Sequence, residues 1–298
     1  MRPQLTERLY LASLSLAVVT LLLLRLFVVP HFETQPTLDL LAITNSILDS
    51  LTGAAVASLL VSILLITIIG RQIKEGQEAE VIDAKKVGPL LKDTAARTSL
   101  WNYRGHTGQY FRTMILPTLA RESSNTGRRI TMCVQVLNPD DADLMDYFMA
   151  YRTSGPSSRN GTVNRADLEA EILSTILSVA QLAARSPRLD VTLFLSETLS
   201  PYTVDISSEV AVLSRAEESA LKYAFGSTFY QSAVDDLRLG FRQAHEVSFP
   251  ANLPREIDSI DKVKSALALL GIVAVISEDA LANAVLTKMR TPVSPYRQ

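Results

Sequence analysis

The sequence predicts a mixed α/β cytoplasmic domain (α+β or α/β) preceded by an N-terminal two-helix transmembrane hairpin. Three observations lead to this prediction: two long apolar runs, an unequal distribution of Lys and Arg around them, and alternating strand and helix patterns further on. The expected divisions are a transmembrane hairpin at 1–70, a juxtamembrane helical connector at 71–98, a cytoplasmic α/β domain at 99–250 and a C-terminal helical segment at 251–298.

The two apolar runs have the length of membrane-spanning helices. The first covers residues 9–29 with one charge, Arg25, and the second covers residues 51–70 with none. A helix of roughly 20 apolar residues crosses a hydrocarbon core of about 30 Å. The alternative for the first run is a cleaved signal peptide, since Arg2 and Arg8 precede it. We favour a retained helix, because no small-residue cleavage motif follows the run.

The basic residues predict the orientation of this hairpin. Lys and Arg precede the first run and follow the second, whereas the connecting segment 31–50 contains neither. Because Lys and Arg are retained on the cytoplasmic side, both termini are expected in the cytoplasm and the protein in the cell inner membrane as a multi-pass protein. Residues 71–130 hold eleven Lys/Arg against six Asp/Glu, and this basic part would meet anionic lipid head groups.

Composition sets further limits. The chain is 47% hydrophobic with a mean hydropathy of +0.17, and the apolar runs account for the excess over an ordinary globular composition. The remainder is long enough for one domain with a real core. The single cysteine, Cys133, excludes an internal disulfide and a cysteine-based zinc site, which agrees with a reducing compartment.

Periodicity places the elements of the cytoplasmic domain. Residues 129–137 alternate strictly between apolar and other side chains and end at Asn138-Pro139, as a half-buried strand does. Asn164 is expected to cap a long helix with a 3.6-residue apolar period. Further strands are expected at 190–196 and 203–213, the latter with a break near Ser207-Ser208. Further helices are expected at 109–121, 140–152, 217–246, 257–270 and 278–289, and helix breaks at Gly76 and Gly88-Pro89.

The best candidate ligand site is the segment WNYRGHTGQYFR. Its aromatic and basic side chains surround two glycines, Gly105 and Gly108, that permit close backbone approach. Aromatic rings stack on bases, while Arg and loop amides hold phosphates, so the pattern predicts an anionic or nucleotide ligand. In the alternative, the aromatics pack the connector onto the domain and the glycines form turns. The predicted ligand-binding residues are Trp101, Tyr103, Arg104, His106, Arg112 and, from the next helix, Arg152.

Catalytic patterns are sparse. The histidines are His31, His106 and His245, and the sequence contains neither a nucleophile elbow nor a phosphate-binding P-loop. The acidic run 140–146 follows a strand end, where metal sites occur, but helix capping and the helix dipole explain it better. We therefore expect a protein that is not an enzyme and holds no metal or cofactor.

One resemblance involves the order of these elements. Strand 129–137, two helices, the strands at 190–196 and 203–213, and AFGSTFY at 224–230 resemble one half of a phospholipase-D-like domain. Gly226-Ser227-Thr228 is similar to that family's Gly-Ser-x-Asn element but lacks the Asn, and the His-x-Lys-x-x-x-x-Asp motif is absent. The resemblance implies a catalytically inactive version kept for binding. The whole layout also resembles bacterial two-helix membrane effectors of antiviral defence, an analogy of architecture.

These observations lead to one functional expectation. The protein is predicted to be an inner-membrane effector or sensor whose cytoplasmic domain binds a ligand or partner. Binding would drive oligomerisation or rearrangement of the hairpin, with membrane disruption or pore formation as the result. The alternatives are a membrane-anchored phosphodiester or lipid hydrolase and a passive membrane scaffold for a soluble partner. The expected partners are the lipid bilayer, further copies of the chain, and an anionic or nucleotide ligand or a soluble protein.

Overall fold

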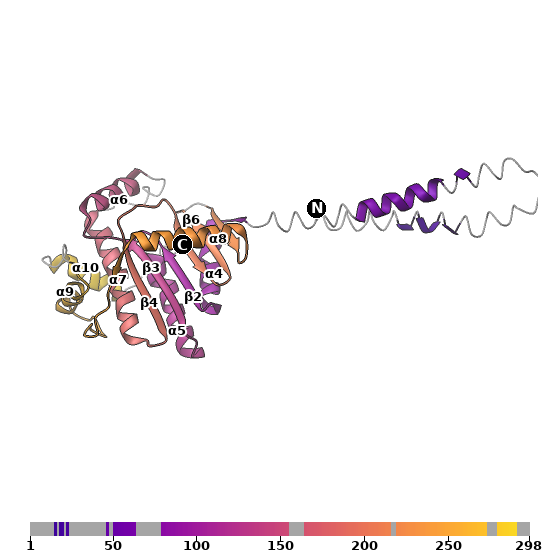
Figure 1. The fold of residues 1–298 in the computed structure, drawn as a ribbon. Coiled ribbons are helices and arrows are strands. Elements are labelled where there is room, and N and C mark those ends of the chain that lie inside the picture. The colour runs from indigo at the N-terminus through magenta and orange to yellow at the C-terminus, as the bar shows by residue number, and fades with distance from the viewer. Residues whose placement is uncertain are drawn as a thin grey trace, which may run out of the picture. The chain divides into compact units, whose positions relative to one another are not determined.

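The computed structural model describes residues 15–16, 18–20, 22–23, 46–47, 50–63, 79–154, 164–215, 219–272 and 279–290. The chain forms two compact units, residues 1–77 (unit 1) and residues 78–298 (unit 2). Each unit is described by itself. Figure 1 shows the elements of unit 2 gathered around one sheet.

Unit 1 is helical where the structure describes it, including residues 50–63. Within the described residues, no helix combines the length and the apolar character needed to cross a bilayer. The predicted transmembrane hairpin is therefore wrong, and so is the inner-membrane location that depends on it. The other residues of the two apolar runs, and nearly all of the segment 31–50 between them, lie outside the described residues.

Unit 2 contains one eight-stranded mixed sheet with helices on both faces. The strands are β1 (Ala79–Ile82), β2 (Leu100–Arg104), β3 (Ile130–Leu137), β4 (Leu189–Ser196), β5 (Thr203–Ser207), β6 (Val210–Ser214), β7 (Ala220–Ala224) and β8 (His245–Val247). The helices are α4 (Ala84–Arg97), the π-helical turn η2 (Phe111–Ile115), α5 (Leu116–Thr126), α6 (Ala142–Ser154), α7 (Arg165–Arg185), α8 (Thr228–Gln243), α9 (Ile260–Leu269) and α10 (Asp279–Arg290).

The strand order is β1-β7-β6-β5-β2-β3-β4-β8. The three strands β2, β3 and β4 are parallel, with Trp101 opposite Met132 and Val134 opposite Leu193. Every other pairing in the sheet is antiparallel. Because the parallel strands are joined by helical crossovers, their carboxyl ends meet at one edge of the sheet, where α/β proteins usually bind ligands.

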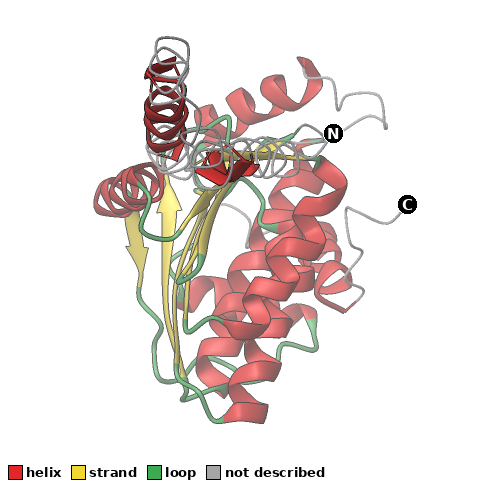
Figure 2. Cartoon of the chain, turned by 90° about the vertical axis from the view of Figure 1, so that its right-hand side faces the viewer, coloured by secondary structure: helices red, strands yellow, loops and turns green. Residues whose placement is uncertain are grey.

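The two faces of the sheet are covered differently, and Figure 2 shows most helices gathered on one side of it. On that side, Trp101, Met132 and Val134 are buried in one large core with side chains of α4, η2, α5 and α7. On the other side, a smaller core forms between β5, β6, β7 and helix α8, with Ile206 and Leu237 among its members. The first face is covered by the large apolar core. On the second face, part of β2, β3 and β4 presents polar side chains.

Several predicted elements are confirmed. β3 and β4 lie within one residue of their predicted bounds, and the break near Ser207-Ser208 separates β5 from β6. The Asn164 side chain accepts a hydrogen bond from the Asp167 amide and caps α7 as expected. Asp141 similarly accepts from the Leu144 amide at 2.9 Å, which explains the acidic run by capping.

The segment expected as a juxtamembrane connector contributes to the sheet and its core. From residue 79 on it forms β1 and α4, and Leu91 and Ala95 of α4 lie in the large core. The helix continues through Pro89, where a break was predicted. The carbonyl of the preceding Gly88 accepts a hydrogen bond from the Tyr110 hydroxyl at 2.7 Å, and a side chain at Gly88 would crowd that hydroxyl.

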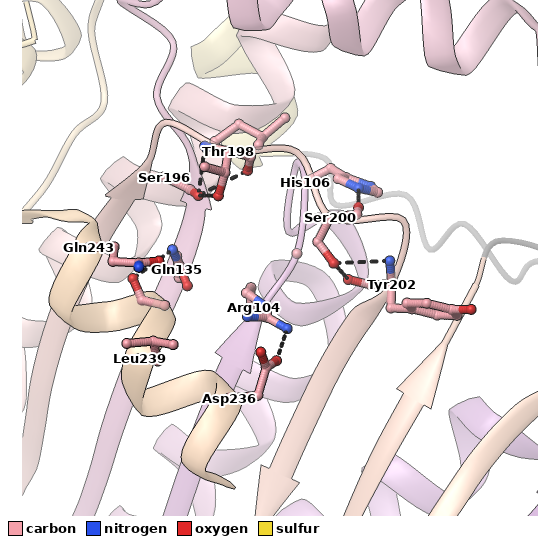
Figure 3. Close-up of a pocket in the computed structure, with 13 residues that line it drawn as sticks. Arg104, His106, Gln135, Ser196, Thr198, Ser200, Tyr202, Asp236, Leu239 and Gln243 are labelled. Carbon is pink, nitrogen blue, oxygen red and sulfur yellow. Dashed lines mark hydrogen bonds and ion pairs between the residues drawn. The ribbon is translucent and has the colours of Figure 1, made fainter. Parts of the chain in front are cut away.

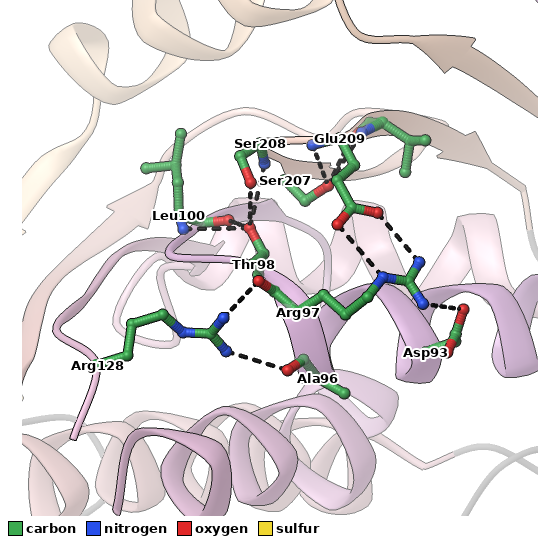
Figure 4. A network of polar contacts seen from close by, with 10 residues as sticks. Asp93, Ala96, Arg97, Thr98, Leu100, Arg128, Ser207, Ser208 and Glu209 are labelled. Carbon is green, nitrogen blue, oxygen red and sulfur yellow. Dashed lines mark hydrogen bonds and ion pairs between the residues drawn. The ribbon is translucent and has the colours of Figure 1, made fainter. Parts of the chain in front are cut away.

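A polar network fixes the end of α4 against the turn between β5 and β6 (Figure 4). Arg97 pairs with Asp93 at 2.6 Å on its own helix and with Glu209 at 3.1 Å. Arg128, which precedes β3, donates to the carbonyls of Arg97 and Ala96 and so satisfies orphan acceptors at the helix end. These contacts lie at the amino end of the parallel strands, opposite the edge considered next.

Candidate functional site

A cavity of about 80 Å³ lies at the carboxyl ends of β2, β3 and β4 (Figure 3). Arg104 ends β2, Gln135 lies near the end of β3 and Ser196 ends β4. The loop from β4 to β5 forms one wall, and α8 forms another through Asp236 and Gly240. This is the position at which the topology of the sheet predicts a binding site.

Arg104 and Asp236 connect two walls of the cavity. The guanidinium Nη2 of Arg104 lies 2.5 Å from Oδ2 of Asp236, as Figure 3 shows, so the two charges compensate each other. The Asp236 side chain is 61% exposed, whereas that of Arg104 is 18% exposed. The Nε of Arg104 is buried and has no hydrogen-bond partner among the described residues. One donor of this guanidinium is therefore left over inside the protein.

Gln135 leaves an acceptor unpaired beside this donor. Its side chain is 2% exposed, and its Nε2 donates to the Gly240 carbonyl at 3.4 Å. Its Oε1 is buried without a partner in the part of the chain that the structure describes. Buried polar groups are nearly always hydrogen-bonded, and each exception requires an explanation. A bound molecule that donates to Gln135 would supply the missing partner.

Gly240 allows these two side chains to approach α8 closely. A methyl group on its α carbon would lie 3.1 Å from Nη1 of Arg104 and 3.3 Å from Oε1 of Gln135. Gly240 has no positive φ, so its backbone does not require a glycine. A glycine within a helix costs about 1 kcal/mol relative to alanine. The close approach of Arg104 and Gln135 to α8 explains why a glycine is present at this position.

His106 holds the loop wall in place. Its Nε2 lies 2.5 Å from the Ser200 carbonyl, and since a carbonyl only accepts, Nε2 carries the proton. The ring also contacts Phe148 and Tyr151 of α6. Burial, and to a smaller extent the charge of Arg152, lowers the pKa of His106. The imidazole is therefore neutral near pH 7 and adds no charge to the cavity.

The loop between β4 and β5 is ordered by its own serines. Ser196 Oγ accepts from the Thr198 amide at 3.2 Å and donates to the Thr198 carbonyl at 3.0 Å. Ser200 Oγ makes the same two contacts with Tyr202, at 3.2 and 3.1 Å (Figure 3). Because both hydroxyls already donate and accept hydrogen bonds within the loop, the loop forms an ordered wall. Among the described residues, the unpaired buried polar atoms of the cavity lining belong to Gln135 and Arg104.

The structure separates the six ligand-binding residues predicted from the sequence. Arg104 and His106 line the cavity. Trp101 and Tyr103 are 1% and 5% exposed and pack in the large core, where the Tyr103 ring stacks on Phe111. Tyr103 belongs to strand β2. Their packing follows the alternative considered above for these aromatics.

Arg112 belongs to a buried ionic cluster away from the cavity. Its Nη2 lies 2.6 Å from Glu171 of α7, and its Nη1 donates to the Lys288 carbonyl at 2.5 Å. Lys288 of α10 in turn pairs with Glu171 at 2.8 Å. The Arg112 side chain is only 4% exposed, and burial lowers its pKa despite the Glu171 charge. This cluster joins η2, α7 and α10, which is a structural function.

Arg152 lies on α6, and its charge acts on the His106 ring. Its Nε is buried without a hydrogen-bond partner among the described residues. The two glycines of the predicted site have packing reasons. A side chain at Gly105 would overlap the Tyr103 ring, and Gly108 has φ +71° with Thr175 directly above it. Gly105 also lines the cavity, whereas Gly108 does not.

Sequence reasoning missed the cavity residues of β3 and α8. Gln135 lies two residues before the end of β3, a buried parallel strand, and this position was a usable signal. Asp236 and Gly240 gave no local signal, because only the fold brings α8 to β2 and β3. Within the described ranges, no group of His, Cys, Asp or Glu side chains is arranged to hold a metal ion.

Comparisons with known proteins give one weak structural similarity. No family model and no curated protein matches the chain. The chain is similar to TrmBL2, an archaeal chromatin protein whose structure shows a novel mode of DNA binding, with a TM-score of 0.32 and 7% identity over 71% of this chain and 70% of that one. At this TM-score the similarity establishes neither a shared fold nor a shared function.

The resemblance to a two-helix antiviral membrane effector with a phospholipase-D-like domain is wrong. The membrane hairpin that defines this layout is not supported, because no described helix has the length and apolar character needed to span a bilayer. Ser227 of the Gly-Ser-Thr element caps α8 by accepting from the Tyr230 amide at 3.0 Å. That contact gives the element a local structural reason.

Proposed function

We propose that unit 2 is a ligand-binding domain that recognises a small polar molecule in the cavity at the carboxyl ends of β2, β3 and β4. One observation carries the proposal: Arg104 and Gln135 both line this cavity, and Nε of Arg104 and Oε1 of Gln135 are buried without partners among the described residues. Leaving such groups unpaired costs about 1–3 kcal/mol each, and a ligand that pairs with both recovers that free energy.

The arrangement favours binding over catalysis. In the described residues, His106 donates to a backbone carbonyl, and no hydrogen bond joins a histidine to a serine, threonine or cysteine side chain. A nucleophile activated by a histidine needs such a contact. That the protein is not an enzyme remains a prediction, as do its assembly with further copies and its binding of a soluble protein partner.

Gly240→Ala tests the proposal because it separates binding from folding. The new methyl group would press on Arg104 and Gln135, while alanine improves the helix by up to about 1 kcal/mol. Binding should therefore weaken by about tenfold or more without loss of thermal stability. The measurement is a thermal-shift screen of a metabolite library on the full chain, followed by titration of the hits.

Ser232→Ala is the matched control. Ser232 is exposed on the same helix, so this change also improves helix propensity but leaves the cavity untouched. Hits that weaken in Gly240→Ala and persist in Ser232→Ala support the cavity as the site. Hits that bind both variants equally would place the ligand elsewhere and contradict the proposal.

A further inference from the structure

We propose that the molecule bound in this cavity is uncharged and rich in hydroxyl groups, a sugar or polyol, with one hydroxyl bridging Arg104 and Gln135. This inference rests on the function proposed above and names the class of its ligand. Its starting point is that the unpaired groups are of opposite kinds: Arg104 offers a donor and Gln135 offers an acceptor. Oε1 of Gln135 and another nitrogen of the same guanidinium, Nη1 of Arg104, both lie next to the α carbon of Gly240.

A hydroxyl group matches this pair, and an anionic oxygen does not. A hydroxyl both accepts and donates, so one oxygen can accept from the guanidinium and give its proton to Oε1 of Gln135. The oxygens of a carboxylate or a fully ionised phosphate only accept, which would leave Oε1 unpaired. Sites that bind a hydroxyl through buried polar groups discriminate strongly against ligands that lack it.

The charges of the cavity point to the same class. The Arg104 charge is compensated by Asp236 at 2.5 Å, and the His106 imidazole is neutral. An anion would have to approach the largely exposed Asp236 carboxylate or displace it from its ion pair. An uncharged ligand leaves that pair intact and can also donate to its carboxylate.

The rim supplies apolar contacts for a ring. Tyr202 from the loop and Leu239 from α8 line the cavity and are 45% and 54% exposed. A sugar ring presents C–H groups between its hydroxyls, so it can pack on such side chains while its polar edge faces Gln135. Because these side chains are exposed, the ligand can extend beyond the cavity of about 80 Å³.

The test compares uncharged and charged probes on the full chain by isothermal titration calorimetry. The probes are glucose, galactose, maltose, trehalose and glycerol, against glucose 6-phosphate, galactose 1-phosphate and inorganic phosphate. We expect saturable binding of at least one uncharged probe. Gln135→Met, which keeps the length of the side chain but removes its amide, should weaken that binding by about tenfold or more.

Gln231→Met is the matched control, because Gln231 is exposed on α8 and does not line the cavity. It should change affinity less than about twofold, and an unchanged melting temperature in both variants excludes misfolding as the cause. The inference is overturned if only the phosphorylated probes or phosphate bind, if no uncharged probe binds, or if the two Gln→Met variants weaken binding equally. The Gly240→Ala screen judges the binding function separately, since its library also contains anions.

Discussion

The two faces of the parallel strands β2, β3 and β4 differ in how completely their side chains are packed and hydrogen-bonded within the protein. On the face covered by α4, η2, α5 and α7, the strands contribute fully buried apolar side chains such as Trp101 and Met132. On the α8 face they contribute Arg104 and Gln135, whose polar atoms remain partly unpaired. The comparison indicates that one face contributes mainly to stability, whereas the other is the face on which we propose that a ligand binds.

The largest expected difference between the faces lies in the stability lost when a side chain of β3 is truncated to alanine. Met132 is 0% exposed, and Met132→Ala should lower the free energy of unfolding by about 2–5 kcal/mol. Its neighbour Cys133 points to the other, partly open face, so Cys133→Ala should cost less than about 1 kcal/mol. Urea unfolding followed by fluorescence of the single tryptophan, Trp101, measures both within unit 2. Equal losses would mean that the two faces are equally packed.

The second comparison concerns two arginines. Arg112→Met removes one partner of a buried ion pair and should destabilise the protein by about 3 kcal/mol. Arg104→Met breaks a pair whose carboxylate is 61% exposed, so it should cost less than about 1 kcal/mol of stability. The same urea titration measures both. Ligand affinity should show the opposite ranking, with the larger loss in Arg104→Met. If the same variant had the larger effect on both stability and binding, the assignment of Arg112 to stability and Arg104 to binding would be refuted.

These comparisons also show what the sequence could predict. Period-2 alternation identified β3, whose apolar face packs in the large core, and capping residues identified α7. The strands β1, β2, β7 and β8 are short or follow polar segments, and their pairing depends on partners distant in sequence. The cavity needed α8 to lie against β2 and β3, which is a contact of the tertiary structure. Arg104 and His106 were predicted from a cluster of aromatic, basic and glycine residues. Arg112 belongs to the same cluster in sequence but does not line the cavity.

The third comparison uses the pH dependence of a carboxyl group on the helix-covered face. Asp205 lies opposite Tyr103 on that face, and burial raises its pKa to about 7. The folded state therefore binds this proton more tightly than the unfolded state, in which the pKa is about 3.9. Its contribution is fully present below pH 4 and is lost as the pH rises towards 7, by up to about 1.4 kcal/mol for each pH unit.

Asp205→Asn should abolish this slope. The measurement is the urea midpoint of both proteins between pH 4 and pH 8, and the difference between them isolates the carboxyl group. We expect the variant to gain stability relative to the wild type as the pH rises. A constant difference across this range would show that Asp205 is ionised in the folded protein.

The smallest expected effect comes from His106 at the cavity, and it has the opposite sign. Burial lowers the pKa of His106, so the folded state disfavours its protonation. Its contribution to stability is present above the unfolded pKa of about 6.5 and is lost as the pH falls through the folded pKa. His106→Gln should remove this loss. The Arg152→Leu variant should raise the pKa of His106, because it removes a nearby positive charge. Nuclear magnetic resonance titration measures this pKa. An unchanged pKa would show that burial alone lowers it.

The position of β1 has a mechanical consequence. β1 begins directly after unit 2 begins, forms the outermost strand and pairs with β7 through four residue pairs. β7 continues through the turn at Gly226 into α8, which carries Asp236 and Gly240. Tension on the chain where it enters unit 2 would therefore load this short ladder first, one strand away from the helix that forms the cavity wall. Because β1 is paired only with β7 among the described strands, these four residue pairs can separate while the other strands stay paired. We therefore expect β1 to detach under tension before the cavity is distorted.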